Sequence, residues 1–249
     1  MFTLPNVITL LNLLCGCLGI IAIWEGKQPL AGYLIIIGLV FDFLDGFVAR
    51  ITKSYSAIGK QLDSLADMTT FGILPALLMF DLMRHSTSER WAVVGLLLAV
   101  FAALRLAKFN IDERQTMGFI GLPTPAMAVA IAALPLIMYY HRPWVVLMNY
   151  NFLATYVALL CWAMVAEIPM MAFKFKTWGW EENKTRYWFI CLSVLFFIFL
   201  DFLAIPLIII GYIAWSLVFY SFDEEENEFI DLPALENQDN HEDLEDILP

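Results

Sequence analysis

Residues 42–67 read DFLDGFVARITKSYSAIGKQLDSLAD, and this stretch decides how the chain folds. Its polar and small residues form the pattern Asp42-x2-Asp45-Gly46-x2-Ala49-Arg50-x8-Gly59-x3-Asp63-x3-Asp67. Four carboxylates and one guanidinium thus recur at helical spacing between long apolar runs. Charged side chains inside membrane segments are costly and mark functional sites. The stretch therefore predicts a polar site within a membrane-embedded helical protein.

The composition agrees with this prediction. The chain has 249 residues, of which 61% are hydrophobic, and its mean hydropathy is +0.72. These values are typical of polytopic membrane proteins and exclude an ordinary soluble domain. The four cysteines form no C-x-x-C pair, so the sequence gives no indication of a zinc site or a disulfide framework.

The net charge of −11 is concentrated at the C-terminus. Residues 223–249 contain twelve Asp and Glu and no Lys or Arg, whereas residues 1–222 contain fourteen basic and thirteen acidic residues, a net charge of +1. A uniformly charged segment with few aromatic residues is typical of disordered, solvated chain. We therefore expect a membrane-embedded domain over residues 1–222 and an acidic cytoplasmic tail over residues 223–249.

The apolar runs predict an all-α, polytopic bundle of about eight transmembrane helices, since one helical crossing needs about 20 apolar residues. The predicted spans are residues 5–24, 29–50, 62–83, 91–109, 123–140, 144–166, 187–202 and 204–220. The last two come from one long run that Asp201 and Pro206 interrupt. A single kinked span is the alternative, and it would move the tail to the other side of the membrane.

The basic residues predict the orientation, because cytoplasmic loops are enriched in Lys and Arg. With a cytoplasmic N-terminus, the inner side holds ten of them and the outer side four. The inner set is Arg50, Lys53, Lys60, Arg105, Lys108, Arg114, Lys174, Lys176, Lys184 and Arg186. This orientation predicts a multi-pass protein of the cell (cytoplasmic) membrane whose polar site faces the cytoplasm.

Helical periodicity brings the polar residues of the second predicted helix to one face. At 100° per residue, five positions fall within an arc of about 140°: Asp42, Asp45, Gly46, Ala49 and Arg50. On the next helix Asp63 and Asp67 are one turn apart, and Thr70 continues their row. We expect Gly59 and residues 52–56 to form the reversal that makes the two faces meet.

Four converging carboxylates need cations. Each unpaired aspartate at mid-membrane would cost about 2.5–3.5 kcal/mol, and one arginine cannot neutralise four. Oxygen ligands suit Mg²⁺ or Mn²⁺, and two such ions are suited to holding a diphosphate. Gly46 and Ala49 would let a polar ligand approach the backbone, and Arg50 offers a fork for a phosphate. Interfacial acids that only balance Arg50, Lys53 and Lys60 are the alternative.

The stretch from Asp42 to Asp67 resembles the complete signature of the CDP-alcohol phosphatidyltransferase family. This resemblance implies an integral membrane enzyme, commonly a homodimer, with a six-helix core that binds a CDP-linked lipid and two divalent metals and releases CMP. Further segments resemble the phosphatidylserine synthase branch of the family. They are Leu4–Asn6 with Leu10–Gly16, Ala103–Asn110, Phe119–Ala126, and Glu167–Pro169 with Lys174–Lys176.

The resemblance also implies roles for individual residues. Four aspartates would ligate the metals: Asp42, Asp45, Asp63 and Asp67. Asp67 would in addition act as the general base on the incoming hydroxyl. The CDP-lipid site would include Gly46, Arg50 and Ser56, with Pro5 and Asn6 closing over it from the first helix.

The branch markers predict the transfer of a phosphatidyl group from CDP-diacylglycerol to L-serine, which gives phosphatidylserine and CMP. The serine carboxylate needs a cation, for which Arg105 and Lys108 are candidates, as are Lys174 and Lys176. The alternative is that these cations are positive-inside anchors that reach the lipid headgroups.

The sequence is compatible with other functions as well. The same chemistry with glycerol-3-phosphate or an inositol phosphate as acceptor is one. A divalent-cation transporter is another, although a cation path has no use for Arg50 beside its carboxylates. A third is a scaffold that recruits partners through the acidic tail. The predicted partners are the two substrates, membrane lipids and a second copy of the chain, and no nucleic acid.

Overall fold

A computed structural model of the chain describes residues 3–54, 56–86, 89–111, 119–141, 143, 149–170 and 179–219. The tail predicted at 223–249, and with it Arg114, Lys174 and Lys176, lies outside the described residues. The predicted all-α class is confirmed, with one pair of two-residue strands added. The elements are α1 (Leu4–Trp24), α2 (Gln28–Thr52), α3 (Ala57–Asp67), η1 (Met68–Ile73), α4 (Leu74–Arg84), α5 (Glu89–Ala92), η2 (Val93–Leu96), α6 (Leu97–Ile111), β1 (Phe119–Ile120), α7 (Thr124–Tyr140), α8 (Tyr150–Val165), β2 (Pro169–Met170), α9 (Trp180–Leu200), η5 (Asp201–Leu203) and α10 (Ala204–Phe219).

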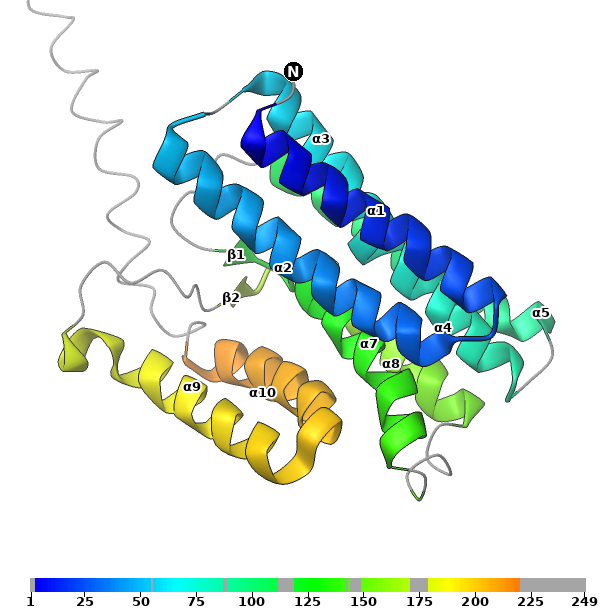
Figure 1. Ribbon diagram of the computed structural model, residues 1–249. Helices are drawn as coiled ribbons and strands as arrows, with labels where there is room; N and C mark the ends of the chain where they lie inside the picture. Colours follow the sequence, from blue (N-terminus) through cyan, green and yellow to red (C-terminus); the bar gives the residue numbers. More distant parts are fainter. Residues whose placement is uncertain are drawn as a thin grey trace, which may run out of the picture.

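The long helices form a bundle in which α1 and α2 lie side by side and antiparallel (Figure 1). α3 packs against α1 and continues through η1 into α4. The N-terminal end of α1, the C-terminal end of α2 and the start of α3 therefore meet at one end of the bundle (Figure 1). This is the end at which the sequence predicts the polar site.

The third predicted helix differs from the prediction in two ways. It begins at Ala57 rather than residue 62, because the side-chain oxygen of Ser56 accepts a hydrogen bond from the backbone N–H of Gly59 and caps the helix. It is also not a uniform α-helix, since residues 68–73 form the π-helix η1 directly after Asp67. A π-helix is wider than an α-helix and is frequent at functional sites. The π-helix changes the spacing after Asp67, yet Asp67 and Thr70 still both make hydrogen bonds to Asn12 of α1.

The predicted break in the last apolar run is confirmed. α9 ends at Leu200, and Asp201 adopts a φ of +47° that ends the helix. α10 then starts at Ala204, with Pro206 in its first turn, where the missing N–H has no helical partner to lose. α9 and α10 return alongside each other as a hairpin that packs on α7 (Figure 1).

The centre of the bundle is α7. Nearly every side chain from Met127 to Ile137 is buried, which suits a helix that is apolar on all sides. It contacts α2, α4, α8 and α10. Before α7, β1 pairs antiparallel with β2, and the N–H of Leu122 donates to the carbonyl oxygen of Ala163 at 2.8 Å. The loop that enters α7 is thereby fixed to the end of α8.

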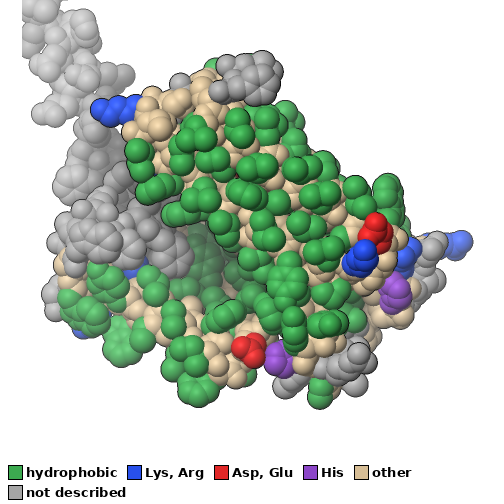
Figure 2. All heavy atoms as spheres, in the orientation of Figure 1, with side chains coloured by type: hydrophobic (Ala, Val, Ile, Leu, Met, Phe, Trp, Pro, Cys, Tyr) green, Lys and Arg blue, Asp and Glu red, His purple; other side chains and the backbone are tan. Residues whose placement is uncertain are grey.

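The outside of the bundle is apolar. Large exposed hydrophobic residues follow the outer face of α1: Leu4, Val7, Leu10, Leu11, Leu14, Leu18 and Ile21. Figure 2 shows this face covered with hydrophobic side chains, with charged ones gathered toward the ends. By length and composition, four helical stretches within the described residues are long and apolar enough to cross a membrane: Leu4–Trp24, Ala57–Arg84, Arg90–Ile111 and Asn183–Leu217. The chain is a multi-pass membrane protein, and the number of eight crossings stays a prediction.

The contact between α2 and α7 offers a test of the packing. A Cβ on Gly32 would lie 2.7 Å from the backbone carbonyl oxygen of Ala132, whereas a Cβ on Gly211 would meet nothing within 4 Å. Gly32→Ala should lower the free energy of unfolding by about 1–3 kcal/mol through overpacking. That corresponds to a melting temperature lower by about 2–4 °C per kcal/mol.

The matched control is Gly211→Ala, which should be neutral or slightly stabilising because alanine has the higher helix propensity. Thermal unfolding in detergent measures both variants. Equal melting temperatures for the two would contradict the α2–α7 packing described here.

Candidate active site

The polar residues of α2 and α3 are brought together by a short reversal. α2 ends at Thr52, and Lys53 adopts the left-handed conformation with a φ of +51°, so that the N–H of Ser54 reaches the carbonyl oxygen of Ala49 at 3.1 Å. Ser56 then caps α3. The prediction placed Gly59 in this reversal, but it lies in the first turn of α3. There its missing side chain lets Asn6 of α1 approach, with Oδ1 only 3.0 Å from where a Cβ would be.

Three of the four predicted carboxylates converge. Asp42 of α2 and Asp63 and Asp67 of α3 each offer an oxygen, and these oxygens lie within 4.8 Å of one another. All three residues are partly buried. This is the one group of three or more potential metal ligands among the described residues. The sequence prediction that α2 and α3 join their acids is therefore confirmed for these three.

Asp45 is placed differently. It is buried, and its Oδ2 accepts a hydrogen bond of 2.5 Å from the hydroxyl of Thr9 on α1. It does not belong to the group of three oxygens. It lines a neighbouring pocket instead, together with Asp63.

That pocket has a volume of about 520 Å³ and opens between α1, α2 and α3. Five of the residues predicted to contact the CDP-lipid line it: Pro5, Asn6, Gly46, Ala49 and Ser56. The sequence reading missed Thr9, Ser54, Ala57 and Lys60, which line it too. Asp63 belongs both to this pocket and to the carboxylate group, so the two form one continuous site.

Arg50 lies beside the pocket. Its side chain is exposed, and a guanidinium nitrogen comes within 3.7 Å of where a Cβ on Gly46 would be. A larger residue at position 46 would thus narrow the space between the guanidinium and the helix backbone. The arrangement leaves a cation next to a strip of bare backbone, which suits a phosphate group.

Asp67 has a partner that the sequence reading did not identify. The side-chain amide of Asn12 on α1 donates to its Oδ1 at 3.5 Å, and Asn12 is fully buried. Asn6, Thr9 and Asn12 follow one another at intervals of three along α1, so they share one side of that helix. This spacing of polar residues within an apolar helix was the available signal.

Arg105 lies deep in the protein, on α6. Only 6% of it is exposed, its Nε donates to the carbonyl oxygen of Leu122 at 2.7 Å, and its guanidinium lies 5.5 Å from the ring centroid of Phe109. Its Nη2 is buried and has no hydrogen-bond partner among the described residues. Asp67 is within electrostatic range of the guanidinium.

Lys108 lies elsewhere, because its side chain points to the protein surface. Its Nζ pairs with the carboxylate of Glu167 at 2.9 Å, and the Glu167 side chain is 72% exposed. Asn110, further along α6, donates to the hydroxyl oxygen of Ser64 on α3 at 3.0 Å. Of the four candidate acceptor cations, Arg105 and Lys108 lie within the described residues, and of these two only Arg105 is buried near the carboxylates.

The donor set fits a hard divalent cation. Three oxygens from two helices lie close enough to share an ion, and carboxylate oxygens are the ligands that Mg²⁺ and Mn²⁺ prefer. A thiol or imidazole, which would favour zinc, is absent from this group.

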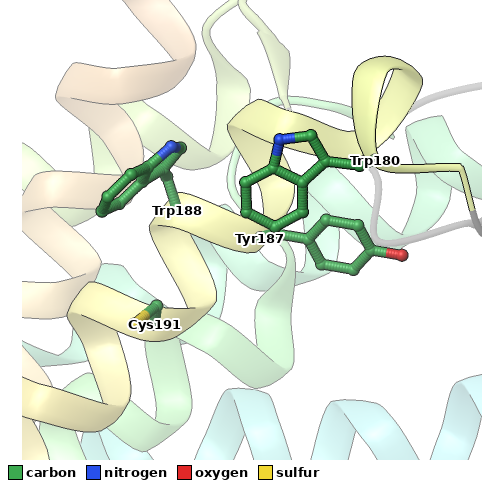
Figure 3. Close-up of a pocket in the computed structure, with 4 residues that line it drawn as sticks. All are labelled: Trp180, Tyr187, Trp188 and Cys191. Carbon is green, nitrogen blue, oxygen red and sulfur yellow. The ribbon is translucent and has the colours of Figure 1, made fainter.

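A second pocket, of about 490 Å³, lies on α9 and is lined by Trp180, Tyr187, Trp188 and Cys191 (Figure 3). Trp180 and Tyr187 stack in it with their ring centroids 5.5 Å apart. Among the side chains that the structure describes, no acid and no cation lines it. The chemistry that the aspartate pattern predicts therefore belongs to the pocket beside Asp63.

Comparisons with known proteins agree with the pattern. The family model described as CDP-alcohol phosphatidyltransferase matches residues 2–168. The chain is 34% identical over 133 residues to a CDP-diacylglycerol–serine O-phosphatidyltransferase of Helicobacter pylori, covering 53% of this chain and 56% of that protein. A Bacillus subtilis protein of the same name is 33% identical over 131 residues, 53% of this chain and 74% of that protein.

An archaetidylserine synthase of Methanothermobacter thermautotrophicus is 35% identical over 141 residues, which cover 55% of this chain and 59% of that protein. The matched region thus spans little more than half the length of the Helicobacter relative.

Metal binding tests the carboxylate group directly. Asp63→Asn should lower the affinity for Mn²⁺ at least about tenfold, because it removes a charged ligand from a group shared by two helices. Electron paramagnetic resonance of free Mn²⁺, titrated with purified protein, measures the affinity. The matched control is Asp201→Asn, which removes an exposed carboxylate at the α9–α10 turn. An equal affinity in the two variants would contradict the site.

Proposed function

The chain belongs to the CDP-alcohol phosphatidyltransferase family, and on this basis we propose that it transfers the phosphatidyl group from CDP-diacylglycerol to L-serine. The observation that carries the proposal is the position of Asp63, which lies both in the carboxylate group and in the pocket that opens between α1, α2 and α3. A nucleotide in the pocket would have its diphosphate beside the carboxylates. The names of the similar proteins support serine as the acceptor.

In the proposed reaction the serine hydroxyl oxygen attacks the phosphorus that carries the diacylglycerol. The bond from this phosphorus to the bridging oxygen breaks, and CMP leaves with that oxygen. Two bound divalent cations, Mg²⁺ or Mn²⁺, would neutralise the diphosphate and the charge that develops on the leaving oxygen. We assign their ligation to Asp42, Asp45, Asp63 and Asp67.

The remaining steps belong to side chains of the chain itself. Asp67 accepts the proton of the serine hydroxyl, which requires it to reach that oxygen directly or through one water. Gly46 and Ala49 leave room for the nucleotide against α2, and Arg50 binds a phosphate oxygen. Pro5, Asn6 and Ser56 enclose the CDP portion from the other side of the pocket.

Arg105 binds the serine carboxylate in this proposal. A buried guanidinium nitrogen without a partner is unfavourable, and a carboxylate would supply the missing acceptor. The bond from Nε to Leu122 fixes the plane of the guanidinium, so that Nη2 is held in one direction. Lys108, paired with Glu167 at the surface, has no comparable need of a ligand.

The membrane arrangement completes the proposal. The site lies at the end of the bundle where α2 ends and α3 begins, and the excess of Lys and Arg there supports a cytoplasmic position for this end. The lipid tails of both substrate and product can then stay in the bilayer. About eight crossings, an acidic cytoplasmic tail at 223–249 and a homodimer belong to the same proposal.

An acceptor panel tests the function. Purified protein with Mn²⁺ and CDP-diacylglycerol should release CMP with L-serine, and not with glycerol-3-phosphate or inositol phosphate. Chromatography of CMP measures the turnover. CMP release with glycerol-3-phosphate but not with serine would assign another acceptor to the same site, and release with none of the three would overturn the proposal.

A substitution at Arg105 tests the acceptor site. Arg105→Lys keeps a cation but loses the planar fork. Because hydrogen bonds to charged groups contribute about 1.5–3 kcal/mol, KM for serine should rise by about 10- to 150-fold. KM for CDP-diacylglycerol should change little.

Lys108→Gln is the matched control on the same helix and should leave both KM values near those of the unmodified protein. If Arg105→Lys raises the two KM values equally, the effect is structural and the assignment is wrong.

A further inference from the structure

We propose that Asn12 is a positioning residue, which holds the Asp67 carboxylate in place across the junction between α3 and η1. The inference rests on the proposed function, in which Asp67 is a metal ligand and the general base. Asp67 is the last residue of α3. The π-helix η1 follows at once, over Met68–Ile73.

The helix changes its hydrogen-bonding pattern directly after Asp67. Residues 68–73 form a π-helix, in which each residue bonds to the one five positions away, and such turns are frequent at functional sites. A ligand and base must keep its orientation, since small misplacements at a reacting centre cause large losses of rate.

Asn12 of α1 contacts both sides of the junction. Its side-chain Nδ2 donates to Oδ1 of Asp67 at 3.5 Å. Its backbone carbonyl oxygen accepts a hydrogen bond of 2.9 Å from the hydroxyl of Thr70, three residues further on and inside η1. One residue of α1 is thus bonded to the end of α3 and to the first turn of η1.

The contact is tightly enclosed. Asn12 and Thr70 are both fully buried. A Cβ on Gly16 would lie 2.6 Å from the Thr70 hydroxyl oxygen, and a Cβ on Gly38 would lie 2.6 Å from the Thr70 methyl and 2.9 Å from Oδ1 of Asn12. These two glycines let α1 and α2 close around the junction, which leaves the Asn12 amide little freedom to turn.

The amide also carries an unfavourable feature that a purely structural residue would avoid. Its Oδ1 is buried and has no hydrogen-bond partner among the described residues. An apolar residue of the same shape would remove this unpartnered oxygen. The presence of an amide is explained by the bond that its other end makes to Asp67.

Asn12→Leu tests the proposal, because leucine keeps the branched shape and removes both polar ends. Its melting temperature, measured in parallel, reports any overpacking in this enclosed contact. Its affinity for Mn²⁺ should fall by about tenfold or more, and kcat by about 10- to 100-fold, as for other residues that orient ligands. KM for CDP-diacylglycerol should stay within about threefold, because the nucleotide pocket is unchanged.

Two further variants make the test decisive. Leu11→Ala alters the neighbouring side chain on the outer face of α1 and should leave Mn²⁺ affinity and kcat unchanged. Thr70→Val removes only the second hydrogen bond at nearly constant shape, and should lower both quantities less than Asn12→Leu does. If Asn12→Leu does not fold, Thr70→Val decides, and an unchanged Mn²⁺ affinity in it overturns the proposal.

A folded Asn12→Leu variant whose Mn²⁺ affinity and kcat both stay within about threefold of the unmodified values also overturns it. The metal measurement keeps this result apart from the proposed function. If the unmodified protein releases no CMP, the proposed function fails, while the Mn²⁺ affinities of the variants still decide the role of Asn12.

Discussion

The mutual repulsion of acids from two neighbouring helices is the constraint on which this structure depends. Two unit charges about 4 Å apart repel each other by about 4 kcal/mol at an effective dielectric constant of 20, and three carboxylates here lie within 4.8 Å. Among the described residues, no Lys or Arg forms an ion pair with these three carboxylates. A shared divalent cation would offset this repulsion. The helices α1, α2 and α3 keep the carboxylates close enough together to bind one.

α1 contributes to the site as much as α2 and α3 do. Its outer face carries the leucines and isoleucine that suit a lipid environment. Its inner side bonds Asp45 through Thr9 and Asp67 through Asn12. One side of α1 therefore faces the lipid, while the other holds two of the aspartates through hydrogen bonds. The side chains that do this are about one helical turn apart.

Local periodicity explains what could be predicted from the sequence. Asp42, Asp63 and Asp67 were expected to meet because their spacing fixes the faces of two adjacent helices, and the break at Asp201 followed from a charged residue and a proline within one apolar run. The π-helix η1 was not predicted, because helical periodicity assumes a uniform α-helix; in the structure its Thr70 lies against Gly16 of α1 and Gly38 of α2. The roles of Thr9 and Asn12 were missed because their partners lie far along the chain, and the surface ion pair of Lys108 with Glu167 was missed for the same reason.

The most direct test of the account is the position of the metal in a crystal structure grown with Mn²⁺ and CDP, located by anomalous scattering. We expect two Mn²⁺ ions bound by Asp42, Asp45, Asp63 and Asp67, with the phosphates of CDP on the same ions and the nucleotide in the pocket beside Gly46. Mn²⁺ bound away from these carboxylates, or a nucleotide whose phosphates touch no ion held by them, would contradict it.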